Sequence, residues 1–205
     1  MFYCKTELED YVEKIYHIMR ISDPDSLNAK NIADILHIKL TISNTLTKAI
    51  RGSLQYFINI NVSIPSNKRW ESFGHELHHV LRDTGNQNYL PFPLKELHER
   101  SADNFALQFC IPTFMLDQLR WPESNAALYV ANKFRVTLPF ARQRLDLYED
   151  KLLQYRQDEY EMLVREPPTA KYDLSECTDE TQRIMQKLKN QLEKKGEKFE
   201  IKSLL

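Results

Sequence analysis

At 205 residues and 42% hydrophobic content, the chain can bury one sizeable core, which excludes a disordered protein. The formal net charge of −1 excludes a strong overall attraction to nucleic acid or to a membrane surface. No apolar stretch is long enough to span a membrane and the start is not signal-like, so we expect a cytoplasmic protein. The cysteines Cys4, Cys110 and Cys177 lie far apart, which is typical of reduced thiols.

The first third of the chain predicts two helices and two strands. Apolar residues at helical spacing favour an amphipathic helix over residues 6–20. Asn28 or Asn31 can start a second, short helix. Alternating apolar and polar residues then predict strands over residues 38–42 and 56–64, which we expect to pair in a small antiparallel sheet.

A histidine-rich motif, Gly74-His75-Glu76-Leu77-His78-His79, follows in a helix that begins near Ser66. His75 and His79 stand four residues apart, so both imidazoles project from one helical face and can reach one metal ion. Glu76 is about 100° of helical rotation from His75, where its carboxylate can take a proton from a water molecule. This spacing is that of a zinc hydrolase, although a solvated surface helix can carry the same short pattern.

A third ligand distinguishes these alternatives, because catalytic zinc takes three protein ligands and keeps one open position. Twenty residues after His79, Glu99 supplies a carboxylate, and Asp103 supplies a second one on the same helical face. Glu99 can complete a His, His, Glu site. Asp103 can accept the spare ring N–H of a histidine ligand and so fix its orientation. Zn²⁺ and Mn²⁺ both accept this ligand set.

These two motifs carry a resemblance to a known family. Gly-His-Glu-Leu-His-His, followed by Glu-Arg-Ser-Ala-Asp-Asn-Phe-Ala-Leu-Gln-Phe-Cys-Ile-Pro, resembles the ImmA/IrrE metallopeptidases, whose members carry His-Glu-Leu-Gly-His and then Glu-x-Glu-Ala-Asn/Asp-x-Phe-Ala. The likeness covers roughly residues 5–160. It implies a compact gluzincin-like zinc peptidase of bacteria and their mobile elements. It also implies a substrate class, the helix-turn-helix transcriptional repressors.

Two residues depart from the family pattern. His78 occupies the position that usually holds Gly, and Ser101 replaces the second Glu. His78 therefore either points away from the site into solvent or contacts the ligands from behind. His75, His78 and His79 offer alternative metal-binding pairs, of which His75 with His79 is better aligned and leaves Glu76 in position to act.

The loop over residues 83–93 connects the two ligand helices and is expected to border the cleft. Tyr89 in this loop can donate a hydrogen bond to the oxyanion that forms during peptide hydrolysis. The alternative is a tyrosine packed against the core.

The segment after Pro112 is predicted to be helical, and residues 127–145 resemble a helix-turn-helix with Arg142 and Arg144 on its second helix. This pattern supports a second hypothesis, a DNA-binding protein or a non-catalytic anti-repressor. The lack of a basic surplus weakens it, because DNA-binding domains usually carry one.

The composition changes near Glu166-Pro167-Pro168, which cannot continue a helix. Residues 166–205 are charged and contain few large apolar residues other than Ile184, Leu188 and Leu192, which fit one amphipathic helix. Such an extension can dock on the main domain, bind a partner or remain solvated.

The sequence thus predicts an α+β, zincin-like peptidase domain over residues 1–165, mostly helical with a small antiparallel sheet, and a helical C-terminal extension over residues 166–205. The predicted function is a zinc-dependent endopeptidase that acts on a protein substrate, with no membrane partner. The predicted site uses His75, His79 and Glu99 as Zn²⁺ ligands, Glu76 as the base, Asp103 as the orienting carboxylate and Tyr89 as an oxyanion donor.

Overall fold

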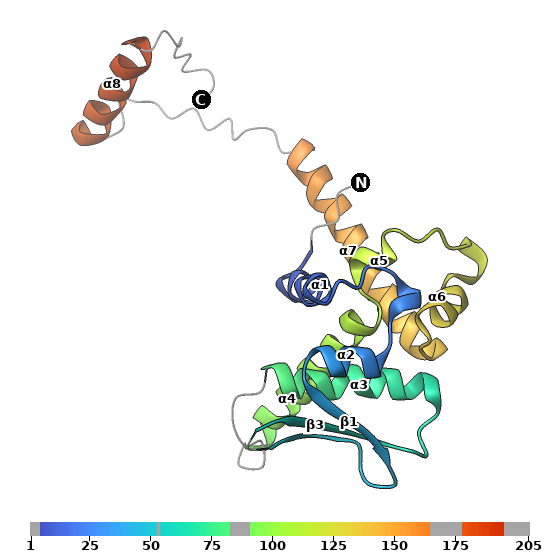
Figure 1. The fold of residues 1–205 in the computed structure, drawn as a ribbon. Helices are drawn as coiled ribbons and strands as arrows, with labels where there is room; N and C mark the ends of the chain where they lie inside the picture. The colour runs from blue at the N-terminus through green and yellow to red at the C-terminus, as the bar shows by residue number, and fades with distance from the viewer. Residues whose placement is uncertain (1–4, 53, 83–90, 165–177, 195–205) are drawn as a thin grey trace. The chain divides into compact units, whose positions relative to one another are not determined.

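The computed structural model describes residues 5–52, 54–82, 91–164 and 178–194. Its helices and strands are, in chain order, α1 (Glu7–Met19), η1 (Pro24–Ser26), α2 (Ala29–Ile35), β1 (Ile38–Ser43), β2 (Lys48–Arg51), β3 (Tyr56–Asn61), α3 (Ser66–Arg82), α4 (Phe92–Cys110), α5 (Thr113–Leu116), η3 (Glu123–Asn125), α6 (Ala126–Phe134), α7 (Leu138–Val164) and α8 (Asp179–Lys194) (Figure 1). The described part is mostly helical with one small sheet, which confirms the predicted α+β, zincin-like class.

The chain divides into two compact units, residues 1–154 and 155–205. The second unit contains the end of α7 and the predicted amphipathic helix, α8. In the ranges that the structure describes, no helix combines the length and the apolar character that a membrane crossing requires.

The ends of α1 and α2 are capped by residues that form hydrogen bonds with backbone groups left unpaired at a helix end. Thr6 and Glu9 form a capping box, so two of the unpaired N–H groups at the start of α1 have partners. Arg20 ends this helix in the left-handed conformation, with a φ of 57°. Asn28, rather than Asn31, caps α2 by accepting from Lys30 and from Asn31.

The sheet has the order β1-β3-β2 and is mixed. Strand β3 pairs with β1 in parallel, from Ile38 opposite Tyr56 to Ser43 opposite Asn61, and with β2 antiparallel. The antiparallel pairing that the sequence predicted for the first and last strands is therefore wrong. The unpredicted strand β2 causes the difference: it reverses the chain, so β3 returns in the direction of β1 and lies between the two.

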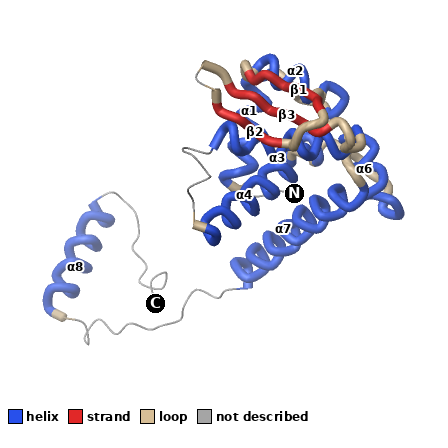
Figure 2. The backbone as a smooth tube through the Cα atoms, turned by 90° about the horizontal axis from the view of Figure 1, so that it is seen from below, coloured by secondary structure: helices blue, strands red, loops and turns tan. Residues whose placement is uncertain are grey.

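Helix α3 packs across β2 and β3, and α4 packs on α3 (Figure 2). The core between these layers contains Ile58 and Ile60 of β3 and aromatic side chains of the helices. Phe105 and Phe109 stack with ring centroids 5.5 Å apart, and Tyr16 of α1 stacks on Phe109 at 4.9 Å. Burial of these large side chains is the main stabilising term for this arrangement.

Asn59 organises the loop between β1 and β2 from the other face of the sheet. Its carboxamide oxygen accepts from Thr41 and from Ser43, at 3.1 and 2.8 Å. Its nitrogen donates to the Thr45 hydroxyl and to the Leu46 carbonyl, both at 2.9 Å. Because every polar atom of this buried amide is used, the loop that leads into β2 has a defined path.

Arg144 of α7 is fully buried, and its charge is compensated by Glu9 of α1. Its guanidinium lies 3.5 Å from the Glu9 carboxylate and donates to the Ile111 carbonyl at 3.1 Å and the Thr113 hydroxyl at 2.7 Å. Lys151 also contacts Glu9, at 2.9 Å. This network joins α1, α5 and the first part of α7.

We expect Arg144→Met to destabilise the protein by about 3 kcal/mol, because it leaves Glu9 buried beside fewer cations. The matched control is Arg142→Met, an exposed position on the same helix, which should change the free energy of unfolding by less than about 0.5 kcal/mol. Urea unfolding of both variants measures the difference. A loss below about 1 kcal/mol for Arg144→Met would contradict a compensating role for this network.

Candidate metal centre

Helix α3 presents different residues to its two sides. Trp70, Phe73 and Leu77 are buried in the core, which fixes the rotation of the helix about its axis. His75 and His79 stand on another face, with side chains 23% and 10% exposed. The apolar stripe therefore sets the direction in which the two imidazoles point.

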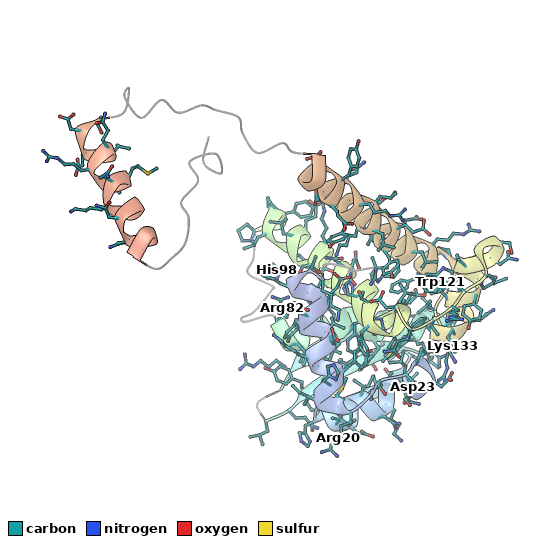
Figure 3. All side chains as sticks on the ribbon, turned by 90° about the horizontal axis from the view of Figure 1, so that it is seen from above. Arg20, Asp23, Arg82, His98, Trp121 and Lys133 are labelled. Atoms are coloured by element: carbon teal, nitrogen blue, oxygen red, sulfur yellow. The ribbon has the colours of Figure 1, made fainter. Side chains whose placement is uncertain are left out.

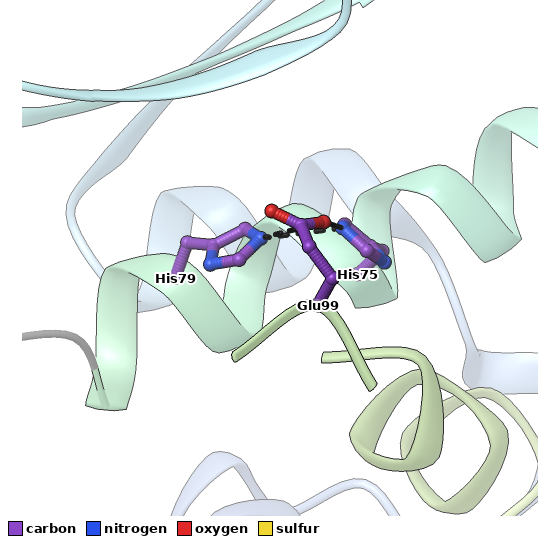
Figure 4. Close-up of side chains that lie close together, drawn as sticks. All are labelled: His75, His79 and Glu99. Atoms are coloured by element: carbon purple, nitrogen blue, oxygen red, sulfur yellow. Dashed lines mark hydrogen bonds and ion pairs between the residues drawn. The ribbon is translucent and has the colours of Figure 1, made fainter. Parts of the chain in front are cut away.

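The structure brings His75, His79 and Glu99 together (Figure 4). His75 Nε2 lies 3.2 Å from Glu99 Oε2 and 3.2 Å from His79 Nε2. His79 Nε2 lies 4.0 Å from the same carboxylate oxygen. One atom from each of the three side chains is thus within 4.8 Å of the other two, and the three residues could bind a metal ion.

Asp103 lies behind this cluster. Its Oδ1 is 2.8 Å from His75 Nδ1. An ionised carboxylate can only accept a hydrogen bond, so His75 donates from Nδ1, and a neutral His75 that does so has its lone pair on Nε2, the atom that faces Glu99. This is the tautomer that a metal ligand needs.

Glu76 is buried, with 8% of its surface exposed, and its Oε2 accepts the Ala49 N–H of strand β2 at 2.5 Å. Burial raises the pKa of this carboxyl above its ordinary value, while the hydrogen bond from Ala49 and the nearby His75 and His79 lower it. A carboxylate with a raised pKa is a stronger base, which suits a group that must accept a proton.

His78 is buried and points toward α4. Its Nε2 lies 3.1 Å from the Ser101 hydroxyl, and its ring centroid is 5.5 Å from that of Phe105. Only 3% of the residue is exposed, so the solvated orientation considered for it does not occur. The two residues that depart from the family pattern are in direct contact with each other.

A cavity of about 360 Å³ opens beside His75 and Glu76. Its walls come from the loop before β2, from α3 and α4, and from the first turns of α7, and the lining residues are Thr47, Lys68, Glu71, Ser72, His75, Glu76, Asp103, Ala106, Leu107, Phe140 and Gln143. A space of this size next to the ligand cluster can hold a side chain of a bound peptide.

Two residues that reach this region were missed in the sequence. Ala49 contributes only a backbone N–H, which no sequence pattern reveals unless β2 itself is predicted. Glu71 lines the cavity, and its carboxylate accepts the Thr137 N–H at 2.6 Å, which anchors the start of α7. Its position four residues before His75, on the same helical face, was an available signal.

Tyr89 lies in residues 83–90, outside the described residues, so its predicted role stays a prediction.

The helix-turn-helix predicted over residues 127–145 forms as α6, a turn at Arg135 and α7. Most of its basic side chains are used within the protein. Lys133 forms an ion pair with Asp25 at 2.7 Å. Figure 3 labels Lys133 and, near it, Asp23. Arg135 donates hydrogen bonds to the Leu27 and Asp25 carbonyls. Arg144 is fully buried, so its side chain is not available to contact DNA.

Helices α3 and α4 lie in close contact at Gly74, directly before His75. A Cβ atom placed on Gly74 would meet Cys110 Sγ at 2.8 Å and Ala106 Cα at 3.4 Å. Cys110 is fully buried, and its thiol contacts the Trp70 carbonyl, which makes it a core thiol. The absence of a side chain at Gly74 therefore lets the two ligand helices pack together.

A histidine-bearing helix and a carboxylate-bearing helix, packed on a small mixed sheet, define the class of zincin-like domains. A family model described as the IrrE N-terminal-like domain, Peptidase_M78, matches residues 33–146. The chain belongs to this family, the ImmA/IrrE peptidases.

Two relatives come from Bacillus subtilis (strain 168). The phage-like element PBSX protein XkdA is 36% identical over 146 residues, which cover 70% of this chain and 74% of that protein. The uncharacterized protein YqaB is 32% identical over 157 residues, which cover 76% of this chain and 91% of that protein.

A solved structure described as a Mycobacterium tuberculosis transcriptional regulator shares the fold with a TM-score of 0.50 at 17% identity. The match covers 68% of this chain and 46% of that one, so the chain spans less than half of that regulator.

We expect Gly74→Ala to destabilise the protein by about 1–3 kcal/mol, since the added methyl group overpacks the contact between α3 and α4. In an open helix position the same change would stabilise by up to about 1 kcal/mol. The control repeats the substitution in a Cys110→Ala background, which lacks the sulfur atom. There Gly74→Ala should lower the free energy of unfolding by less. Chemical unfolding of the four proteins tests this, and an equal cost in both backgrounds would contradict the proposed contact.

Proposed function

We propose that the chain is a zinc-dependent, site-specific endopeptidase that cleaves a helix-turn-helix transcriptional repressor and thereby derepresses mobile-element or stress genes. The observation that carries this proposal is the convergence of two imidazole nitrogens and one carboxylate oxygen within 4.8 Å, beside the buried carboxylate of Glu76.

The donor atoms fit zinc in type and in spacing. Two histidine nitrogens with one carboxylate oxygen form a known catalytic zinc set, and bond lengths near 2.0–2.1 Å place tetrahedral ligands about 3.3 Å apart. Two of the three separations, both 3.2 Å, lie close to this value, and the third, from His79 Nε2 to Glu99 Oε2, is 4.0 Å. His75, His79 and Glu99 would hold the ion. When bound, zinc would lower the pKa of water and polarise the scissile carbonyl.

Glu76 would act as the general base. Its Oε2 is held by the Ala49 amide, and in the described part of the chain no other hydrogen bond to this carboxylate forms. The second oxygen can therefore accept the proton of the attacking water and then deliver it to the leaving amine. Asp103 would keep His75 in the tautomer that leaves Nε2 free.

A protein substrate follows from membership of a peptidase family. The similarity to XkdA, a protein of a phage-like element, supports a role in a mobile element and with it a repressor as the substrate. Tyr89 is proposed to donate a hydrogen bond to the oxyanion during cleavage.

The first prediction from this function separates catalysis from metal binding. Glu76→Gln should keep stoichiometric zinc and lower the rate of cleavage by at least about 10²-fold, because the amide can still accept from Ala49 but cannot take a proton. His79→Ala should lose both zinc and cleavage. Elemental analysis and a single-turnover cleavage assay measure the two effects. Full cleavage by Glu76→Gln would rule out this mechanism.

The second prediction separates an enzyme from a binding protein. Incubation with the helix-turn-helix repressor encoded beside its gene should give one pair of fragments, and 1,10-phenanthroline should prevent the cut until zinc is restored. A stable complex without fragments would favour the non-catalytic anti-repressor. A gel-shift experiment with the operator DNA completes the comparison. We expect no shift, because Arg144 is buried and Lys133 and Arg135 are bonded within the protein.

A further inference from the structure

The part of α4 that carries Glu99 makes few buried contacts. The buried residues of this helix begin at Ala102 and continue from Phe105 to Cys110. Before them, Phe92 and Leu97 are 80% and 59% exposed. Glu99 thus stands outside the segment that the core anchors. Its position depends on the nearest contacts between α4 and α3.

The hydrogen bond between His78 and Ser101 is one of these contacts. Ser101 comes two residues after Glu99, and His78 directly precedes His79. The hydrogen bond between His78 Nε2 and Ser101 Oγ, 3.1 Å long, therefore joins the two helices within two residues of a proposed ligand on each.

The imidazole of His78 is itself held in place. Its ring centroid lies 5.5 Å from that of Phe105 and 5.6 Å from that of His79. A buried ring with neighbours on two sides has little rotamer freedom, so it can hold α4 at a defined distance from α3. A glycine at this position would have no side chain that reaches Ser101.

We propose that His78 and Ser101 form a positioning clamp that sets the separation of His79 and Glu99 and so raises the affinity of the site for zinc. This inference rests on the proposed function. A second bond between the same helices, from His75 to Asp103, acts on the other histidine ligand. The two bonds together fix the carboxylate-bearing turn of α4 against both histidines.

Ser101→Ala tests the clamp with a minimal change. Removal of the hydroxyl should weaken zinc binding by about tenfold, which is typical of partners that orient metal ligands. The unfolding midpoint of the metal-free protein should fall slightly, because the buried His78 loses a hydrogen-bond partner, and Ser101→Thr should restore it. Ser101→Thr keeps a hydroxyl and should restore affinity. Asn104→Ala, at an exposed position next to Asp103, is the matched control and should bind zinc like the parent.

Competition with a chromophoric zinc chelator gives the affinities. His78→Phe keeps an aromatic ring beside Phe105 but cannot bond to Ser101, so Ser101→Ala should have no further effect in that background. If His78→Phe does not fold, the zinc affinities of Ser101→Ala, Ser101→Thr and Asn104→Ala still test the clamp. Unchanged affinity in Ser101→Ala, or an equal loss in both backgrounds, would overturn the clamp alone. A parent protein that binds no zinc would overturn both this inference and the proposed function.

Discussion

The close packing of α3 on α4 is the contact on which the candidate site depends. Two histidines come from one helix and the carboxylate from the other, and the atoms that meet are 3.2 Å apart. A small shift between the helices would separate them, since metal ligands must be held to about 0.5 Å. Gly74 permits the approach, because a methyl group there would lie 2.8 Å from Cys110 Sγ. This contact lies one residue before His75. The close approach of α3 and α4 is therefore needed both for the packing of the two helices and for the metal-ligand cluster.

The two helices are anchored by different neighbours. Helix α3 lies on the sheet, and α4 packs against α1, where Tyr16 stacks on Phe109 and donates to its carbonyl at 2.8 Å. The strand β2 adds a polar contact, because its Ala49 amide holds Glu76. Burial of a carboxylate costs free energy, which the hydrogen bond from Ala49 offsets in part for Glu76.

Elements with strong local patterns were predictable, and contacts between distant segments were not. The strands over residues 38–42 and 56–64 were found because their apolar residues alternate, but their pairing was wrong because the four residues of β2 show no such pattern. The sequence places Arg144, with Arg142, on the second helix of a helix-turn-helix-like segment. Its burial depends on Glu9, at the opposite end of the domain sequence, and no local signal reports that ion pair.

The sequence by itself determined the spacing of His75, Glu76 and His79, because residues four apart face the same side of any α-helix. It also identified Glu99 and Asp103 as the carboxylates able to join them. Only the tertiary structure decided that these groups meet, and that His78 turns inward to Ser101. The physical reason is that periodicity is a property of one helix, whereas a distance between two helices depends on every side chain packed between them.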